Sequence, residues 1–321
     1  MENKRLLYID QLRGIVMLLV VMVHLCGTAN STELQSFMNI IGNFRMPLFF
    51  FVSGYIINKV TKIYNLKDMF QFYKKKAIAL LVPCVMWTLI INNFFFTNAP
   101  HIPTLYEIQQ CFSNDGHLWF LTTLFQYMIA VGIFRYFILS NKTNYAIISL
   151  VIFFAVMGFL FFEFGFLRKS TLYFPYFTIG LISSAFTNIE NIIRKNITFI
   201  ISALLFCLLS GYWVSGQTSI FNVSVRAISA MTAIIALFNF VTRLTWEKYT
   251  DKVIRKIGVN TLSVYVMHWY FLISVELSQN WLFALLQLLV YSLIISFVCI
   301  GIDKLLCTHK YLKLWFLGKQ K

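Results

Sequence analysis

The sequence predicts an all-α membrane protein, with about ten transmembrane helices that form one domain over residues 1–321. Two features of the sequence support this prediction. First, 59% of the residues are hydrophobic and only 12% are charged, whereas a soluble domain carries about 25% charged residues. Second, the apolar residues gather in long runs, and most of the basic residues lie in the short segments between those runs.

Ten apolar runs are each long enough to cross a bilayer, which takes about 20 residues. They lie at 7–27, 40–59, 77–97, 118–139, 145–164, 171–187, 197–214, 222–243, 258–277 and 281–306. The sixth run is the weakest, because it is short and contains Pro175. The first run resembles a signal peptide in position, but it contains charged residues and lacks small residues before Cys26, so we expect an uncleaved helix.

The basic residues predict that both termini are cytoplasmic, in a multi-pass protein of the cell membrane. With the N-terminus inside, 22 of the 27 Lys and Arg residues fall in cytoplasmic segments, and the outside loops hold only Arg168 and Lys169. This asymmetry also explains the net charge of +15, so we expect no nucleic-acid partner. The six cysteines include no C-x-x-C pair, so the sequence predicts no metal site.

The first predicted helix carries Asp10, Arg13 and His24 in an otherwise apolar run. Charged groups at membrane depth are costly and are therefore candidates for function. Arg13 and His24 are eleven residues apart, which places them on nearly the same helix face and about 16 Å apart along the axis. Asp10 is three residues before Arg13 and can pair with it. The alternative is that all three serve only helix packing.

The next two predicted helices add further candidates for binding a substrate. Arg45 lies in the second helix at a depth similar to that of His24, and Ser53 with Gly54 permits close helix packing. Lys75 and Lys76 belong to a run of three lysines before the third helix. Such a run suits a phosphorylated ligand or anionic lipid head groups, although a topology signal alone explains it equally well.

Two residues nearer the C-terminus complete the set of candidates. Trp119 opens the fourth helix at the outer face, where a tryptophan often serves only as an interfacial anchor. His268 lies near the middle of the ninth run and must face protein or water rather than lipid. The sequence leaves function and packing equally open for His268.

These segments together resemble acyltransferase family 3, which includes O-acetyltransferases of bacterial surface polysaccharides. The matching segments are Tyr8–Ile15 followed by His24, Met46–Tyr55, Trp119–Leu121 and Ser263–His268. The sequence departs from the family where two arginines often stand three apart before a proline. Here Lys76 retains a charge at the first position, and Ala79 replaces the second arginine.

The resemblance implies transfer of an acyl group, most simply acetyl, from cytoplasmic acyl-CoA to a hydroxyl of an envelope glycan or lipid-linked sugar. Acetyl-CoA would then be a co-substrate, and we expect no permanently bound cofactor. The family pattern and the titration range of imidazole make His24 the expected general base, and Asp10 and Arg13 are the other expected catalytic residues, with Arg13 at the cytoplasmic end where it can hold the phosphorylated donor. Arg45 is expected to stabilise developing negative charge.

Two other classes of protein remain open at this point. An exporter of a glycan would also carry intramembrane charges, although transporters often show internal repeats and this sequence shows none. A membrane scaffold without catalysis would not need three polar residues on one helix. The sequence identifies neither the acceptor nor the acyl group, which is either acetyl or a larger group such as succinyl.

Overall fold

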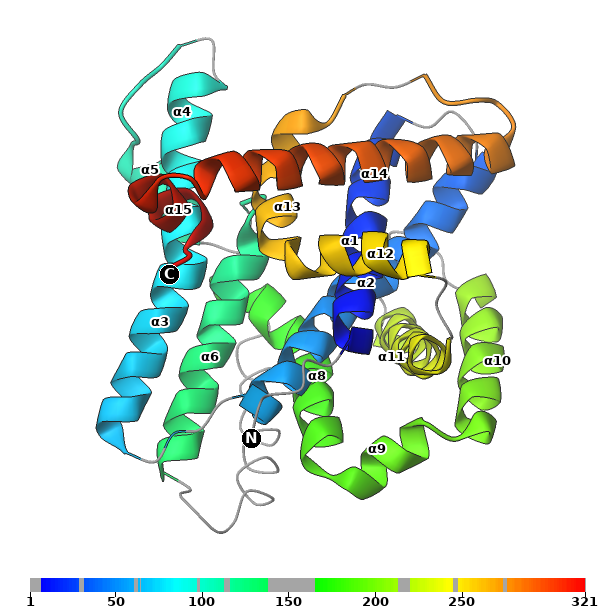
Figure 1. The fold of residues 1–321 in the computed structure, drawn as a ribbon. Helices are drawn as coiled ribbons and strands as arrows, with labels where there is room; N and C mark the ends of the chain where they lie inside the picture. Colours follow the sequence, from blue (N-terminus) through cyan, green and yellow to red (C-terminus); the bar gives the residue numbers. More distant parts are fainter. Residues whose placement is uncertain are drawn as a thin grey trace.

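The computed structural model describes residues 7–28, 32–60, 63, 65–96, 99–112, 116–137, 165–212, 220–244, 248–273 and 276–320 (Figure 1). Within these ranges the regular structure is entirely helical. The first half contains α1 (Leu7–Leu25), η1 (Cys26–Thr28), α2 (Thr32–Val60), α3 (Leu66–Val85), the π-helix η2 (Met86–Ile91), α4 (Asn92–Phe95), α5 (Leu105–Phe112) and α6 (Trp119–Phe137). The second half contains α8 (Gly165–Ala185), α9 (Thr187–Ile193), α10 (Asn196–Tyr212), α11 (Ile220–Arg243), α12 (Lys248–Val259), α13 (Thr261–Met267), η3 (His268–Phe271), α14 (Trp281–Leu306) and α15 (Lys310–Leu317).

Five helical segments in the described residues are long and apolar enough to cross a membrane. They are Leu7–Leu25, Thr32–Ile57, Leu66–Phe95, Phe221–Arg243 and Trp281–Leu306. A sixth is possible if the bent pair α9 and α10, which meet at 62°, forms one span. The apolar parts of α6 and α8 are shorter, at Trp119–Gly132 and Leu172–Ala185.

The expectation for the ninth run is wrong in one respect, because 258–277 is not one long helix. It consists of the end of α12, the short helix α13 and the 3-10 turn η3. The fifth expected run, 145–164, lies outside the described residues. The count of ten spans and the cytoplasmic position of both termini stay predictions.

Glycines bring two helix pairs of the core into backbone contact. A Cβ added to Gly14 of α1 would lie 2.1 Å from the carbonyl oxygen of Ile254 in α12, and one added to Gly258 would lie 1.8 Å from that of Asp10. Gly54 of α2 and Gly180 of α8 make the same kind of reciprocal contact. Small residues permit such an approach between membrane helices. The first pair therefore fixes α1 against the segment that leads into α13.

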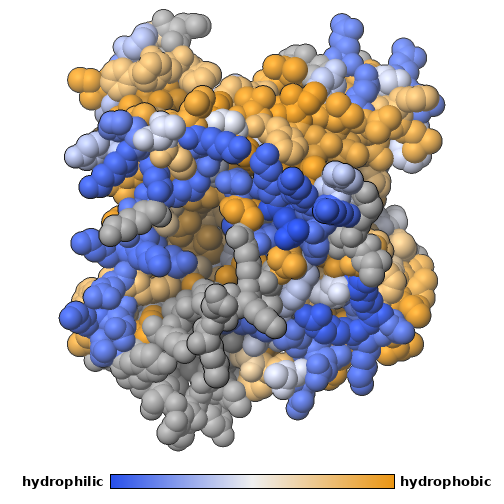
Figure 2. All heavy atoms as spheres, in the orientation of Figure 1, coloured by the Kyte–Doolittle hydropathy of each residue, from blue (hydrophilic) through white to orange (hydrophobic). Residues whose placement is uncertain are grey.

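The outward faces of α10 and α14 are apolar. Figure 2 shows a hydrophobic band where Figure 1 places α14, with hydrophilic atoms directly beside it over α12. The exposed side chains of α14 include Leu282, Phe283, Leu286, Val290, Ile294 and Val298. Surfaces of this kind fit contact with lipid acyl chains.

Candidate active site

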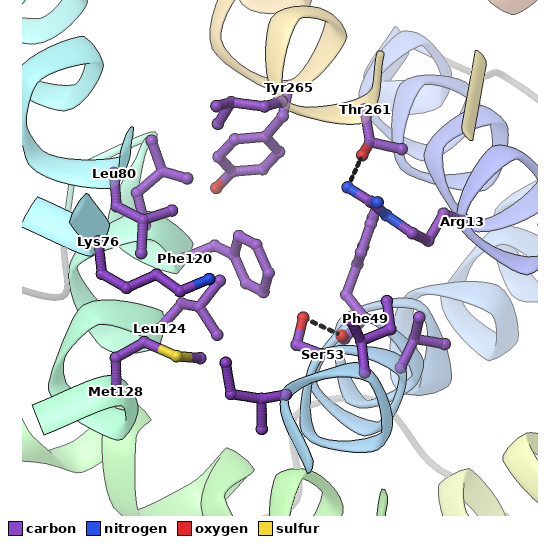
Figure 3. Close-up of a pocket in the computed structure, with 15 residues that line it drawn as sticks. Arg13, Phe49, Ser53, Lys76, Leu80, Phe120, Leu124, Met128, Thr261 and Tyr265 are labelled. Atoms are coloured by element: carbon purple, nitrogen blue, oxygen red, sulfur yellow. Dashed lines mark hydrogen bonds between the residues drawn. The ribbon is translucent and has the colours of Figure 1, made fainter. Parts of the chain in front are cut away.

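A cavity of about 240 Å³ lies between α1, α2, α3, α6 and α13. Its walls are mostly apolar, and Figure 3 shows the polar side chains that reach into it. Arg13 and Lys76 enter from opposite sides of the cavity, and Ser53, Thr261 and Tyr265 provide hydroxyl groups. Three of the residues expected from the sequence to bind a substrate or take part in catalysis therefore line one cavity.

Arg13 is held in the cavity wall by α13. Its Nη2 donates a hydrogen bond of 2.6 Å to Oγ1 of Thr261, and that hydroxyl lies 3.3 Å from the carbonyl oxygen of Gly258. Because Gly258 is also the point of contact with α1, the guanidinium and its partner belong to one packed unit. The expected pairing of Arg13 with Asp10 stays a prediction, and Asp10 itself is buried.

The cavity has the electrostatic character of an anion site. Arg13 and Lys76 both line it, and no Asp or Glu occurs among its described lining residues. The two positive charges act on each other across the cavity. An anionic group between them would relieve this repulsion and accept charge-assisted hydrogen bonds, which are stronger than neutral ones.

Tyr265 connects this cavity to a second group of polar side chains. Its ring lines the cavity and packs 5.4 Å from Phe120. Its hydroxyl donates to the carbonyl oxygen of His117 over 3.2 Å, and its ring centroid lies 5.9 Å from that of His268. The Tyr265 side chain therefore lies against both the cavity and the imidazole of His268, and its hydroxyl reaches the backbone of His117.

Three imidazoles lie at Trp269, and the sequence analysis named two of them, His24 and His268, as candidates. The His24 ring centroid lies 5.4 Å from those of both His268 and Trp269. The His117 ring stacks on Trp269 at 5.9 Å. Trp269 is 46% exposed, so the group reaches the surface of the molecule. We call His24, His117, His268 and Trp269 the imidazole cluster.

Arg45 borders the imidazole cluster from α2. Its Nη1 donates to the carbonyl oxygen of Val20 over 3.2 Å, and its buried Nε has no hydrogen-bond partner among the described residues. The positive charge of Arg45 acts on both His24 and His268. A cationic donor with one uncommitted N–H beside a candidate base can stabilise negative charge that develops there.

The remaining expected residues occupy different surroundings. Ser53 lines the cavity while its hydroxyl donates to the carbonyl oxygen of Phe49 over 2.8 Å. Lys75 is exposed and does not line the cavity. Trp119 packs against Phe50 and stacks on Tyr173, and it is not among the residues that line the cavity. Its predicted role in substrate binding therefore gains no support from its position.

The sequence analysis named none of Thr261, Tyr265, Trp269 and His117 as a candidate. Their contacts with Arg13, with His24 and with one another join distant parts of the chain. The segment Tyr265–Tyr270 is unusually rich in aromatic and imidazole groups. That density was the one available signal.

The backbone at Ala79, where the family often has a second arginine, packs closely against the C-terminal segment. Gly318 has a left-handed backbone with φ of 62°, and a Cβ added to it would lie 2.7 Å from Cα of Ala79. The C-terminal segment is held there by Lys319, whose Nζ lies 2.5 Å from the buried Oδ1 of Asp303. A side chain at position 318 would therefore clash with the backbone of α3 at Ala79.

Comparison with known proteins agrees with the sequence resemblance. A family model described as an acyltransferase domain matches residues 6–302, which is nearly the whole chain. The resemblance inferred from the sequence motifs is thereby confirmed. Searches of the curated proteins and of the solved structures found no match.

Proposed function

Because the chain belongs to acyltransferase family 3, we propose that it is an O-acyltransferase of the cell membrane that uses acyl-CoA, most simply acetyl-CoA. The acceptor is a hydroxyl of an envelope glycan or of a lipid-linked sugar. Acyl-CoA acts as a co-substrate, and no cofactor is permanently bound. The glycan exporter is the competing function.

The charge of the cavity is the observation that best supports this proposal. Coenzyme A carries several phosphate groups, and the cavity offers Arg13 and Lys76 without a described acidic residue in its lining. Apolar side chains such as Leu80, Leu124 and Met128 line the rest of it. A cavity with two cations and apolar walls suits part of a phosphorylated donor that ends in an uncharged thioester.

The imidazole cluster supports the chemical step. In the proposed reaction, His24 removes the proton of the acceptor hydroxyl while its oxygen attacks the thioester carbonyl. The new C–O bond forms as the C–S bond breaks, and the coenzyme leaves as a thiolate that takes up the proton from His24. Arg45, with its uncommitted Nε–H, stabilises the negative charge on the carbonyl oxygen.

The two groups lie toward opposite ends of α1, which fits a donor and an acceptor that arrive separately. Arg13 and His24 are about 16 Å apart along the helix axis, and both contact the α13–η3 segment through Thr261 and His268. With the predicted topology, the donor enters from the cytoplasmic side. The thioester end of the bound donor then extends past Tyr265 to the imidazole cluster, where the acceptor oxygen attacks it.

A binding measurement with a matched control tests the role of the cavity. Lys76→Gln removes a cavity cation, and Lys67→Gln removes an exposed one from the same helix. A hydrogen bond to a charged group contributes about 1.5–3 kcal/mol, so we expect Lys76→Gln to weaken acetyl-CoA binding about tenfold to a hundredfold. Lys67→Gln should leave the affinity nearly unchanged. Equal effects of the two variants would contradict a donor site in this cavity.

A transfer assay tests the reaction itself. Purified protein in lipid nanodiscs is incubated with labelled acetyl-CoA and with envelope glycans from cells that lack the gene. We expect label to appear as a base-labile ester on a glycan, and His24→Ala to abolish it. Glycan movement across a vesicle membrane without any transfer of label would support the exporter instead.

A further inference from the structure

We infer that His268 is a positioning residue that accepts a hydrogen bond from His24 and so fixes which nitrogen of His24 is free to act as the base. This inference rests on the proposed function for its catalytic consequence. Its structural part, a bond between the two imidazoles, holds independently of the substrate. Neither the family match nor the cavity assigns this role to His268.

The surroundings of His268 determine where its proton lies. Its Nδ1 is 2.8 Å from the carbonyl oxygen of Tyr265 and 3.1 Å from that of Val264. Carbonyl oxygens only accept hydrogen bonds, so Nδ1 must carry the proton, and the neutral ring then has a lone pair on Nε2. The backbone of α13 thus sets the tautomer of His268.

The Nε2 atom of His268 is a buried acceptor without a partner. The side chain is 4% exposed, and Nε2 makes no hydrogen bond to any described residue. A buried acceptor that is left without a hydrogen bond is destabilising, because the water that it loses on burial is not replaced. A neighbouring N–H would therefore be stabilised strongly by turning toward this atom.

The imidazole of His24 lies against the ring of His268. The centroids of the two rings are 5.4 Å apart and their planes meet at 41°. At that separation a modest rotation of the partly buried His24 side chain brings an N–H toward Nε2 of His268. The second nitrogen of His24 is then unprotonated and free to accept the proton of the acceptor hydroxyl.

Arg45 is the competing donor to His268. Its Nε also lacks a partner, and its charge acts on His268 as well as on His24. If Arg45 were the partner, His268 would position the cation rather than the base. The experiment must therefore distinguish these two arrangements as well as a purely structural role.

Two conservative substitutions separate a positioning role from a structural one. In His268→Asn the amide can reach the carbonyl of Tyr265 but offers no acceptor to His24. In His268→Gln the longer side chain places its amide oxygen near the position of Nε2. We expect His268→Asn to lower kcat at least tenfold with unchanged acetyl-CoA affinity, and His268→Gln to retain most of the activity. If His268→Gln loses more activity than His268→Asn, the inference is overturned in favour of a structural role.

Two further measurements complete the test. The loss caused by His268→Asn should persist in an Arg45→Gln background, whereas no further loss there would identify Arg45 as the partner. Nitrogen-15 NMR of histidine-labelled protein reports the protonated nitrogen of His24 without any substrate. We expect the His24 tautomer to change in His268→Asn and to be retained in His268→Gln. If the His24 tautomer is unchanged in His268→Asn, the inference is overturned, whether or not the protein transfers an acyl group. If the tautomer changes but no acyl group is transferred, only the proposed function is refuted.

Discussion

Replacing Gly14 by alanine tests whether the contact between α1 and α12 holds Arg13 in the cavity wall. The added Cβ would lie 2.1 Å from the carbonyl oxygen of Ile254, and carbon atoms essentially never approach closer than 3.0 Å there. The helices must therefore separate by about 0.9 Å, the difference between these distances. Such a shift would stretch the 2.6 Å bond between Arg13 and Thr261 to the limit of hydrogen bonding.

The matched control is Gly301→Ala in α14, where an added Cβ meets nothing within 4 Å. Both variants gain about 1 kcal/mol of helix propensity, so the difference between them isolates the cost of the close contact. Overpacking costs about 1–3 kcal/mol. We therefore expect Gly14→Ala to have the lower thermal unfolding midpoint in detergent and the weaker acetyl-CoA binding. Equal midpoints and equal affinities would refute the reasoning.

Two further predictions concern the C-terminal segment and the loop before α5. Lys319→Ala leaves the carboxylate of Asp303 buried without its cation, so we expect a loss of about 1–3 kcal/mol in thermal unfolding, and no loss in the exposed control Lys310→Ala. In the loop, hydrogen bonds from the backbone N–H of Thr104 and from the His101 ring lower the pKa of Glu107 to about 2. Hydrogen bonds to the backbone carbonyl of Ala99 and to the Glu107 carboxylate raise the pKa of His101. The contribution of Glu107 to stability is present above its ordinary pKa of 4.5 and is lost as the pH falls toward 2; that of His101 is present below 6.5 and is lost as the pH rises through its raised pKa. After correction for the intrinsic exchange rate at each pH, the amides of this loop should be most protected from hydrogen exchange between pH 4.5 and 6.5. A flat protection profile in the unmodified protein would contradict the pairing.

Residues within one helix were predictable because their relative positions depend only on helix geometry. Arg13 and His24 were expected on one face of the first helix, and both do contact the same segment, α13 and η3. The helical class was predictable for a similar reason, since apolar runs of sufficient length specify membrane helices without knowledge of their neighbours.

The partners of these residues could not be predicted, because they come from distant parts of the chain. Nothing in the spacing of His117 and Trp269 indicates that their rings stack beside His24. The expectation of one helix over 258–277 failed because mean apolarity does not reveal the break at Asn260 or the 3-10 turn at His268. That break is what allows Thr261 and His268 to face α1 in different surroundings.

The packing of the Phe49, Phe120 and Tyr265 rings bears on whether ions can leak across the membrane through the protein. Their centroids follow one another at 5.5 and 5.4 Å in the wall of the cavity, and the Tyr265 ring continues to within 5.9 Å of the His268 ring in the imidazole cluster. A protein that receives one substrate from each side of a membrane must not let protons or ions leak down their gradients between the two. Under the proposed function, these three packed aromatic rings would provide such a seal, because parting for an uncharged acyl thioester costs far less than parting for a hydrated ion.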